Sequence, residues 1–371
     1  MFNGPIAVVA DTSRNLFVFD YYNNRIRKIT SDGTVSTFVG GGQGSVPGYG
    51  TNVSLPGSAA VTMTIDHSNT IYFVAYGSGT IMFRIGSDGY VSTIPVSLAG
   101  GQVRDGICAD SGNNIYIADN SGNKIYRYRT NGVFEVFAGS GNAGSVDGNG
   151  IFTSFSSPNS LTADAADNIY VGDGNGKLIR RINQNKDVVT IAGNQSSTDS
   201  DGVGTNASLY QASAMCADNS GNIYLACYSG TGGSSVRKIT ATTNVTTLAG
   251  SFTQHGYVNG AGSLARFEGS GVMGICFSQG TIYVADFGNQ RIRSITNNPT
   301  AQPVLPANLQ LGTYPGLQIT GTVGRSYQIQ SSGDLNAWTT RATLLLTASP
   351  YLWIDPNPVA GNKFYRALLL P

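Results

Sequence analysis

The chain contains few of the residue types on which acid–base catalysis, metal binding and nucleic-acid binding depend. Among its 371 residues there are 2 His, and Glu occurs only at Glu135 and Glu268. Charged residues make up 12% of the chain, and 22 basic against 21 acidic residues give a net charge of +1. A chain without a basic excess lacks the electrostatic surface that binds nucleic acid, so we expect no nucleic-acid partner.

Long apolar runs are also missing. No stretch approaches the roughly 20 apolar residues that a membrane-spanning helix needs, so we expect no membrane span. Residues 1–5 lack the basic and apolar regions of a signal peptide. Glu is scarce while Gly, with 49 residues, is abundant, and this composition favours turns and strands over helices. We therefore expect an all-β protein.

A repeat fills most of the chain. Short apolar strings with a central aromatic residue recur every 44 to 59 residues, at Phe17, Tyr72, Tyr116, Tyr170, Tyr224 and Tyr283. Each copy contains segments typical of short strands, which in the first copy are 6–9, 16–19, 25–29 and 35–39. Six four-stranded units bury both faces of each sheet when the sheets pack radially, which predicts a six-bladed β-propeller. A β-solenoid is the alternative, but its repeats are less than half as long.

Three strings identify the kind of repeat. They are Asp-Ser-Gly-Asn-Asn-Ile-Tyr-Ile-Ala-Asp at 110–119, Arg-Ile-Arg-Lys-Ile at 25–29 and Val-Thr-Thr-Leu-Ala-Gly at 245–250. With these strings the sequence resembles the NHL-repeat family over about residues 4–297. The resemblance implies a six-bladed propeller. It implies little about activity, because such propellers serve as binding platforms, scaffolds and occasionally enzymes.

The composition changes after the last repeat. The segment 298–308 holds three prolines and predicts a semi-rigid linker between a propeller at 1–297 and a second domain. Short strand-like segments at 309–371 predict a small β-sandwich. Its strings Tyr-Gln-Ile-Gln-Ser-Ser and Phe-Tyr-Arg-Ala resemble C-terminal modules of secreted bacterial repeat proteins. That likeness implies an extracellular or cell-surface protein, with a signal peptide upstream of Met1, and makes the module a candidate for assembly.

The sixth repeat lacks a visible fourth strand. Fourth strands are recognisable for five of the six copies, and the chain begins part-way through a repeat. We therefore expect that the chain is a fragment of a longer one, or that residues 303–314 fill the open edge of the sixth blade.

The residues that suggest chemistry also have structural explanations. The recurrent Asp20, Asp119, Asp173 and Asp286 are expected to accept hydrogen bonds from the next turn and from Arg25 and its equivalents. The two histidines, His67 and His255, lie in unrelated loops. The Asp-containing loops at 147–150 and 199–204 lack the spacing of an EF-hand loop and are expected to be structural turns. The cysteines, Cys108, Cys216, Cys227 and Cys276, are expected to be buried free thiols, with Cys216 facing Leu225.

One set of positions favours a metal. Asp105 and Asn159 begin inner strands at the mouth of the central channel, where metal-dependent propeller lactonases hold a cation. The resemblance to those enzymes implies a Ca²⁺ site on these two residues. Because no Glu joins them, a water-filled mouth with no cofactor is the alternative, and we expect folding to need no metal.

Aromatic residues favour a binding role. Tyr22, Tyr76, Tyr228 and Phe287 follow second strands, so they are expected to rim one face of the propeller among Asn, Ser and Gly. Tyr49 and Tyr257, in the long connections between repeats, are expected on the same face. Packing on neighbouring loops is the other interpretation. The sequence thus favours a non-catalytic binding or scaffold protein for a glycan, peptide or protein partner. A metal-dependent hydrolase or lyase, and a structural subunit of a cell-surface assembly, are the alternatives.

Overall fold

The computed structural model describes most of the chain. The described residues are 2–44, 46–56, 62–76, 80–98, 106–175, 177–228, 232–268, 272–296, 308–311, 316–332, 336–347, 351–354 and 364–370. The chain divides into two compact units, Met1–Asn297 and Asn298–Pro371. Of the expected linker at 298–308, only Asn308 lies within the described residues, and it begins a strand.

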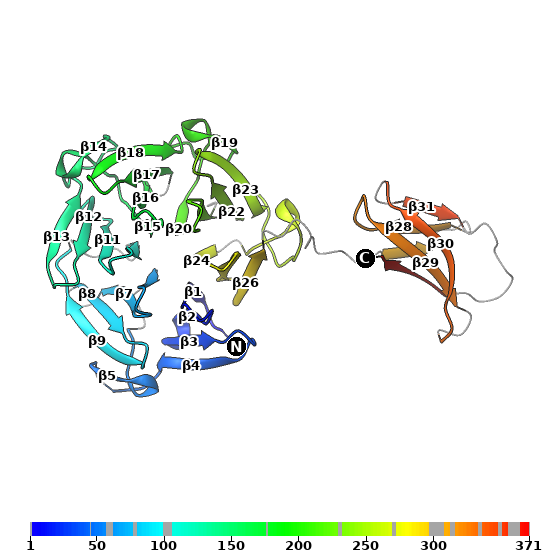
Figure 1. The fold of residues 1–371 in the computed structure, drawn as a ribbon, viewed down its shortest axis with the longest axis horizontal. Helices are drawn as coiled ribbons and strands as arrows, with labels where there is room; N and C mark the ends of the chain where they lie inside the picture. The colour runs from blue at the N-terminus through cyan, green and yellow to red at the C-terminus, as the bar shows by residue number, and fades with distance from the viewer. Residues whose placement is uncertain are drawn as a thin grey trace. The chain divides into compact units, whose positions relative to one another are not determined.

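The described part of the first unit consists of six antiparallel sheets arranged in chain order around a common centre (Figure 1). The innermost strands are β1 (Pro5–Ala10), β6 (Met63–Ile65), β10 (Ile107–Ala109), β15 (Ser160–Ala163), β20 (Ala212–Ala217) and β24 (Val272–Ser278). The second strands are β2 (Leu16–Asp20), β7 (Ile71–Tyr76), β11 (Ile115–Asp119), β16 (Ile169–Asp173), β21 (Ile223–Tyr228) and β25 (Thr281–Asp286). The third strands are β3 (Arg25–Ile29), β8 (Thr80–Ile85), β12 (Lys124–Tyr128), β17 (Leu178–Ile182), β22 (Ser234–Ile239) and β26 (Arg291–Thr296).

Further strands lie outside these three. The fourth strands are β4 (Val35–Gly40), β9 (Tyr90–Pro95), β13 (Phe134–Ala138), β18 (Asp187–Ala192) and β23 (Asn244–Ser251). Two-residue fifth strands, contributed by the preceding connection, are β5 (Gly48–Tyr49), β14 (Gly148–Asn149) and β19 (Gly202–Val203). Short 3-10 turns are η1 (Tyr21–Asn23), η2 (Gly50–Asn52), η3 (Gly150–Phe152), η4 (Gly204–Asn206) and η5 (Gly262–Leu264). The expectation of an all-β propeller is confirmed.

The core lies between neighbouring sheets. Phe19 of the first sheet meets Phe73 of the second edge-on, with ring centroids 5.3 Å apart, and both side chains are fully buried. A further cluster joins the last sheet to the first and includes Val8, Val18 and Ala285. Because each apolar face is buried against the next sheet, the ring is held by the same hydrophobic contact all the way round.

The hairpins between first and second strands use one repeated turn. Asp110 accepts a hydrogen bond from the amide of Asn114 at 2.8 Å, and the hydroxyl of Tyr116 donates to the same carboxylate at 3.1 Å. Three other tyrosines bond to the equivalent Asp in this way, namely Tyr72, Tyr170 and Tyr224. Burial raises the pKa of Tyr170 to about 12, so this phenol remains a donor. The recurrent tyrosine therefore anchors the strand to its own hairpin.

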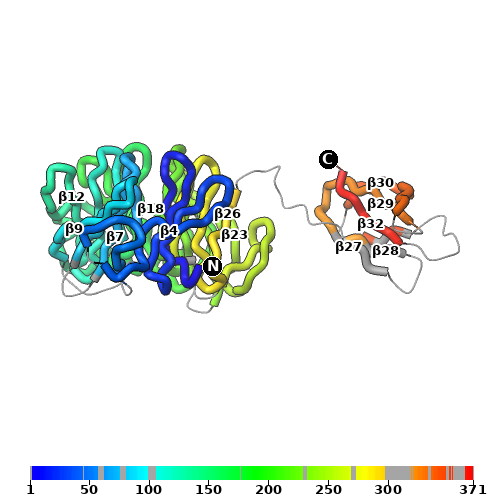
Figure 2. Tube along the Cα trace, turned by 90° about the horizontal axis from the view of Figure 1, so that it is seen from below, coloured from blue at the N-terminus to red at the C-terminus, as the bar shows by residue number. Residues whose placement is uncertain are grey.

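The strand order gives the unit two different faces, seen from the side in Figure 2. Connections from second to third strands and connections between sheets begin on one face, here called the loop face. The hairpins that join first to second strands, and third to fourth strands, lie on the opposite face, here called the turn face.

The last sheet has three described strands, β24, β25 and β26. Residues 5–10 form the innermost strand of the first sheet and do not complete it. The expectation that 303–314 fills this edge is wrong for 308–311, because β27 (Asn308–Leu311) pairs with a strand of the second unit. The other residues of 303–314 lie outside the described residues.

The second unit contains two three-stranded antiparallel sheets. One comprises β27, β28 (Gly316–Thr320) and β31 (Tyr351–Ile354), and the other comprises β29 (Ser326–Ser332), β30 (Thr339–Leu345) and β32 (Phe364–Leu369). Their shared core includes Ile319, Tyr327, Ile329, Leu346 and Trp353. The side chain of Tyr327 is fully buried, and its hydroxyl accepts a hydrogen bond from the amide of Thr322 at 2.8 Å.

None of the helical segments in the described residues is long or apolar enough to cross a membrane.

Candidate binding face and central channel

The recurrent Asp that ends the second strands is structural, as predicted. Asp173 is fully buried, accepts the amide of Ser156 at 2.6 Å and forms an ion pair with Arg180 at 2.8 Å. Burial raises the pKa of the Asp173 carboxyl, although the Ser156 amide and Arg180 oppose that rise. Equivalent pairs are Arg27–Asp20 at 3.7 Å and Arg293–Asp286 at 2.9 Å.

The predicted donor for this Asp was wrong by two residues. Arg25 lies directly opposite Asp20 in the strand pairing, yet the ion pair is made by Arg27. A long side chain on the same face of the sheet reaches the diagonal position across the strands. Arg25 lies instead against Gly41 at the start of the connection between sheets.

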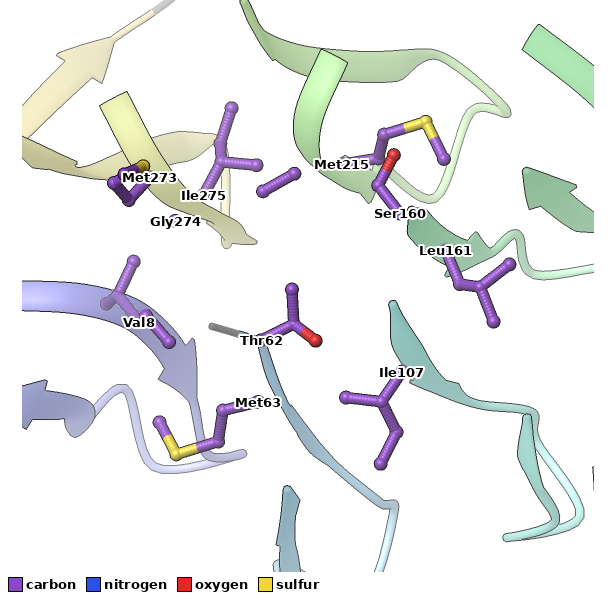
Figure 3. Close-up of a pocket in the computed structure, with 12 residues that line it drawn as sticks. Val8, Thr62, Met63, Ile107, Ser160, Leu161, Met215, Met273, Gly274 and Ile275 are labelled. Atoms are coloured by element: carbon purple, nitrogen blue, oxygen red, sulfur yellow. The ribbon is translucent and has the colours of Figure 1, made fainter. Parts of the chain in front are cut away.

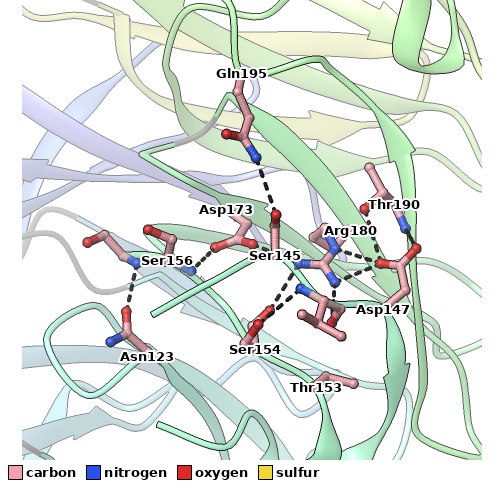
Figure 4. Close-up of polar contacts among 12 residues, drawn as sticks. Asn123, Ser145, Asp147, Thr153, Ser154, Ser156, Asp173, Arg180, Thr190 and Gln195 are labelled. Atoms are coloured by element: carbon pink, nitrogen blue, oxygen red, sulfur yellow. Dashed lines mark hydrogen bonds and ion pairs between the residues drawn. The ribbon is translucent and has the colours of Figure 1, made fainter. Parts of the chain in front are cut away.

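The Asp-containing loops that resemble calcium loops bind arginines. Arg180, whose side chain is fully buried, also holds Asp147 through Nη2 at 2.7 Å and Val146 O at 3.0 Å (Figure 4). In the next sheet the buried Arg237 binds Asp199 and Asp201 in the same way. The prediction that both loops are structural is confirmed, because guanidinium groups take up their carboxylates.

The innermost strands surround a small cavity in the central channel. All six contribute to a cavity of about 30 Å³, lined mainly by aliphatic and methionine side chains, among them Met63, Met215 and Met273 (Figure 3). Thr62 and Ser160 add hydroxyl groups. This volume is enough for about two water molecules.

The two residues expected to bind a metal are not both described. Asp105 lies outside the described residues. Asn159 is buried, with 3% of its surface exposed, and its Oδ1 accepts a hydrogen bond from the Ser160 hydroxyl at 3.4 Å. In the described part of the chain no three His, Cys, Asp or Glu side chains gather as metal ligands would.

The aromatic residues expected on the loop face are only partly brought together. Tyr22 is 60% exposed, and its ring lies 6.0 Å from that of Phe287 across the junction of the first and last sheets. Both rings lie over Gly4, where a β-carbon would come within 2.9 Å of each. Tyr228, at the end of β21, is half-buried. The side chain of Tyr76 lies outside the described residues.

Tyr49 lies elsewhere than expected. The sequence places it with the loop-face aromatics, but β5 runs along the outer edge of the second sheet and pairs Tyr49 with Tyr90. Their rings are 4.7 Å apart beside the 86–90 hairpin of the turn face. The connection between the first and second sheets runs along the outer strand β9 before it reaches the innermost strand β6. The sequence pattern does not predict this path.

The histidines and cysteines form no reactive group. His67 lies in a turn-face hairpin, and His255 lies in the connection before the last sheet, 3.5 Å from Glu268. All four cysteines are buried free thiols, as predicted, and burial raises the pKa of each, that of Cys276 to about 12. Cys216 faces Tyr224 and not Leu225, because the hairpin at 218–222 has five residues and is centred on Ser220.

Solved structures show the same fold. One, described as an auxiliary nutrient binding protein from Bacteroides ovatus ATCC 8483, is 16% identical, with a TM-score of 0.59 over 80% of this chain and 69% of that one. A streptogramin B lyase is 13% identical, with a TM-score of 0.51 over 86% and 90% of the two chains. A putative gluconolactonase is also 13% identical, with a TM-score of 0.51 over 80% and 89%.

No protein-family profile matches the sequence, and no curated protein matches it. At these identities the likeness establishes a β-propeller fold and nothing about activity.

Proposed function

We propose that this protein is a non-catalytic, extracellular or cell-surface binding protein. Residues 1–297 form a six-bladed propeller of the NHL type, and 309–371 form a β-sandwich module suited to assembly. The loop face binds a glycan, peptide or protein through Tyr22, Tyr76, Tyr228 and Phe287. The observation that carries this proposal is the exposed ring of Tyr22 beside Phe287, on a propeller whose innermost strands surround a cavity of only about 30 Å³.

Three further observations support binding. Rigid aromatic rings among small polar residues offer apolar area at little entropic cost, and the loop face carries such a composition. A structurally similar propeller is described as an auxiliary nutrient binding protein. The burial of all four thiols, and the ion pairs of Asp147 and Asp199 with arginines, favour binding over catalysis by these groups.

The alternative is a metal-dependent hydrolase or lyase at the channel mouth, since similar propellers are described as a lyase and as a putative gluconolactonase. We expect EDTA to leave the Tm unchanged, because the described residues gather no multi-carboxylate cluster. A Tm that rises with Ca²⁺, and no longer does so in Asp105→Ala, would favour the enzyme instead.

The binding proposal predicts which tyrosines matter. For a glycan or peptide selected on arrays with the intact protein, we expect Tyr22→Ala and Tyr228→Ala each to weaken binding by about 1 kcal/mol or more. Tyr49→Ala is the matched control, since Tyr49 is 59% exposed but lies beside a turn-face hairpin. Titration calorimetry measures the affinities, and circular dichroism checks the fold. Equal affinity of all three variants and the parent protein would end the proposal.

A further inference from the structure

A single basic residue ends the connection from the second to the third strand in four of the six sheets. These residues are Arg25, Lys124, Lys177 and Arg291. By the strand order they lie on the loop face. Each follows the recurrent Asp closely in the chain, so neutralisation of that buried carboxylate is the simplest explanation for them.

The structure gives that task to other residues. The ion pairs to the recurrent Asp are made by arginines further along the third strands, namely Arg27, Arg180 and Arg293. Among the described residues, none of the four basic residues of the loop face forms an ion pair with a carboxylate. Their charge is therefore not used within the described fold.

The loop face presents little negative charge to offset these cations. Asp20, Asp173 and Asp286 have no exposed surface, and Asp119 has 1%. Glu268 is partly exposed and lies beside His255, in the connection before the last sheet. The hairpins of the turn face, by contrast, carry a carboxylate in five sheets, at Asp11, Asp66, Asp110, Asp164 and Asp218. Within the described residues the loop face is therefore positive, although the net charge of the chain is only +1.

Two of the cations are held in place by contacts of their own. The side chain of Lys124 crosses Gly141, where a β-carbon would come within 2.9 Å of the lysine Cε. The ammonium group of Lys177 donates to Ser197 Oγ at 3.1 Å and lies 5.6 Å from the centre of the Tyr210 ring. Both lysines are half-buried. Less entropy is lost on binding when charged groups are already positioned.

Aromatic and polar groups surround Lys177. The ring of Tyr210 meets that of Phe252 edge-on at 5.7 Å, and the amide of Tyr228 donates to Gln211 O at 3.1 Å, next to Tyr210 in the chain. Exposed amides and hydroxyls lie on the connections of the same sheets, at Ser121, Asn175, Asn194 and Gln195. Aromatic rings, hydroxyl-binding groups and an ammonium group are the three features that an acidic sugar requires.

We propose that the loop face over the third to fifth sheets binds an anionic polysaccharide. Its carboxylate or sulfate groups bind Lys124 and Lys177, and a sugar ring packs beside Tyr210. This inference rests on the binding role proposed above and adds the chemical class of the ligand. A polysaccharide is favoured over an acidic peptide because the two lysines lie on separate sheets with amides and hydroxyls between them, which can bond to sugar hydroxyls.

The test compares acidic and neutral forms of the same saccharides on the intact 371-residue protein. One pair is oligogalacturonate and its methyl ester, and the other is dextran sulfate and dextran. By titration calorimetry we expect one acidic form or both to bind, and the neutral forms to bind at least about tenfold more weakly, because they offer no anion to the lysines. The two pairs distinguish carboxylate from sulfate. Binding should weaken as NaCl is raised above about 0.15 M, because salt screens the charges.

The fourth sheet supplies a matched control for Lys177. Lys177→Gln should weaken binding about threefold, and Lys124→Gln together with Lys177→Gln about tenfold. Lys186 is also half-buried and lies 5.4 Å from the centre of a ring, that of Phe137, but it belongs to a hairpin of the turn face. Lys186→Gln should leave the affinity unchanged. Circular dichroism checks the fold of each variant.

Several results would overturn this inference. They are no binding of either acid at millimolar concentration, equal affinity for acidic and neutral forms, an equal loss in Lys186→Gln, and equally tight binding of polyglutamate. A neutral glycan or a peptide that binds through Tyr22 and Tyr228, while both acids fail to bind, would end this inference and leave the proposed binding function standing. Acids that bind through Lys124 and Lys177 without need of Tyr22 or Tyr228 would support the inference and exclude those two aromatic residues from the site.

Discussion

Replacing Arg180 with Met is expected to lower the free energy of unfolding by about 3–5 kcal/mol, because it leaves a buried carboxylate unpaired. Both Arg180 and Asp173 have fully buried side chains, and their ion pair spans 2.8 Å. Arg180 also holds Asp147 and two backbone carbonyls of the connection between sheets. The substitution therefore removes the charge that offsets the desolvation of Asp173 and releases this connection.

The adjacent residue provides the control. Arg181 lies on the same strand with its side chain exposed, so Arg181→Met should change stability by no more than about 0.5 kcal/mol. Adding Asp173→Asn to Arg180→Met should recover part of the loss, since the unpaired charge is gone. Denaturant unfolding should be followed by circular dichroism, because both tryptophans, Trp338 and Trp353, belong to the second unit. Equal effects at Arg180 and Arg181 would contradict the prediction.

The repeat made most of the propeller predictable. An aromatic residue such as Tyr116, followed by a closing Asp and an alternating strand, fixes the order of strands within each sheet. Radial packing then follows, since sheets that are apolar on both faces bury them against each other. The burial of the four cysteines as free thiols was also predictable, and only the register of Cys216 was off by one residue, because an odd hairpin length shifts its centre.

The partners of individual side chains were less predictable. Asp147 and Asp201 were recognised as structural, but their binding to Arg180 and Arg237 depends on a connection that folds back along the next sheet. The signal that could have revealed these pairs is their similar spacing, since Asp147 precedes Arg180 by 33 residues and Asp201 precedes Arg237 by 36. The path of the equivalent connection between the first and second sheets places Tyr49 away from the loop face.

The fourth and fifth sheets differ in the position of the buried carboxylate that pairs with their arginine. In the fifth sheet Cys227 stands where the fourth has Asp173, and Asp199 stands where the fourth has Ser145. The carboxylate that neutralises the buried arginine has therefore moved from the second strand to the connection. Burial raises the pKa of the Cys227 thiol, with a further rise from Asp199 and an opposing effect of Arg237, so all three side chains share one environment.

This exchange predicts that the carboxylate can be moved back. Asp199→Ser should lower the free energy of unfolding by about 3 kcal/mol, because Arg237 keeps only the half-exposed Asp201. Cys227→Asp alone should also destabilise the protein, because it buries a second carboxylate near Asp199. The double variant rebuilds the arrangement of the fourth sheet and should lose less than either single variant, giving a favourable coupling of about 2 kcal/mol or more. Denaturant unfolding of the parent, the two single variants and the double variant gives this coupling energy. If the losses of the single variants simply add in the double variant, the two positions do not share the arginine.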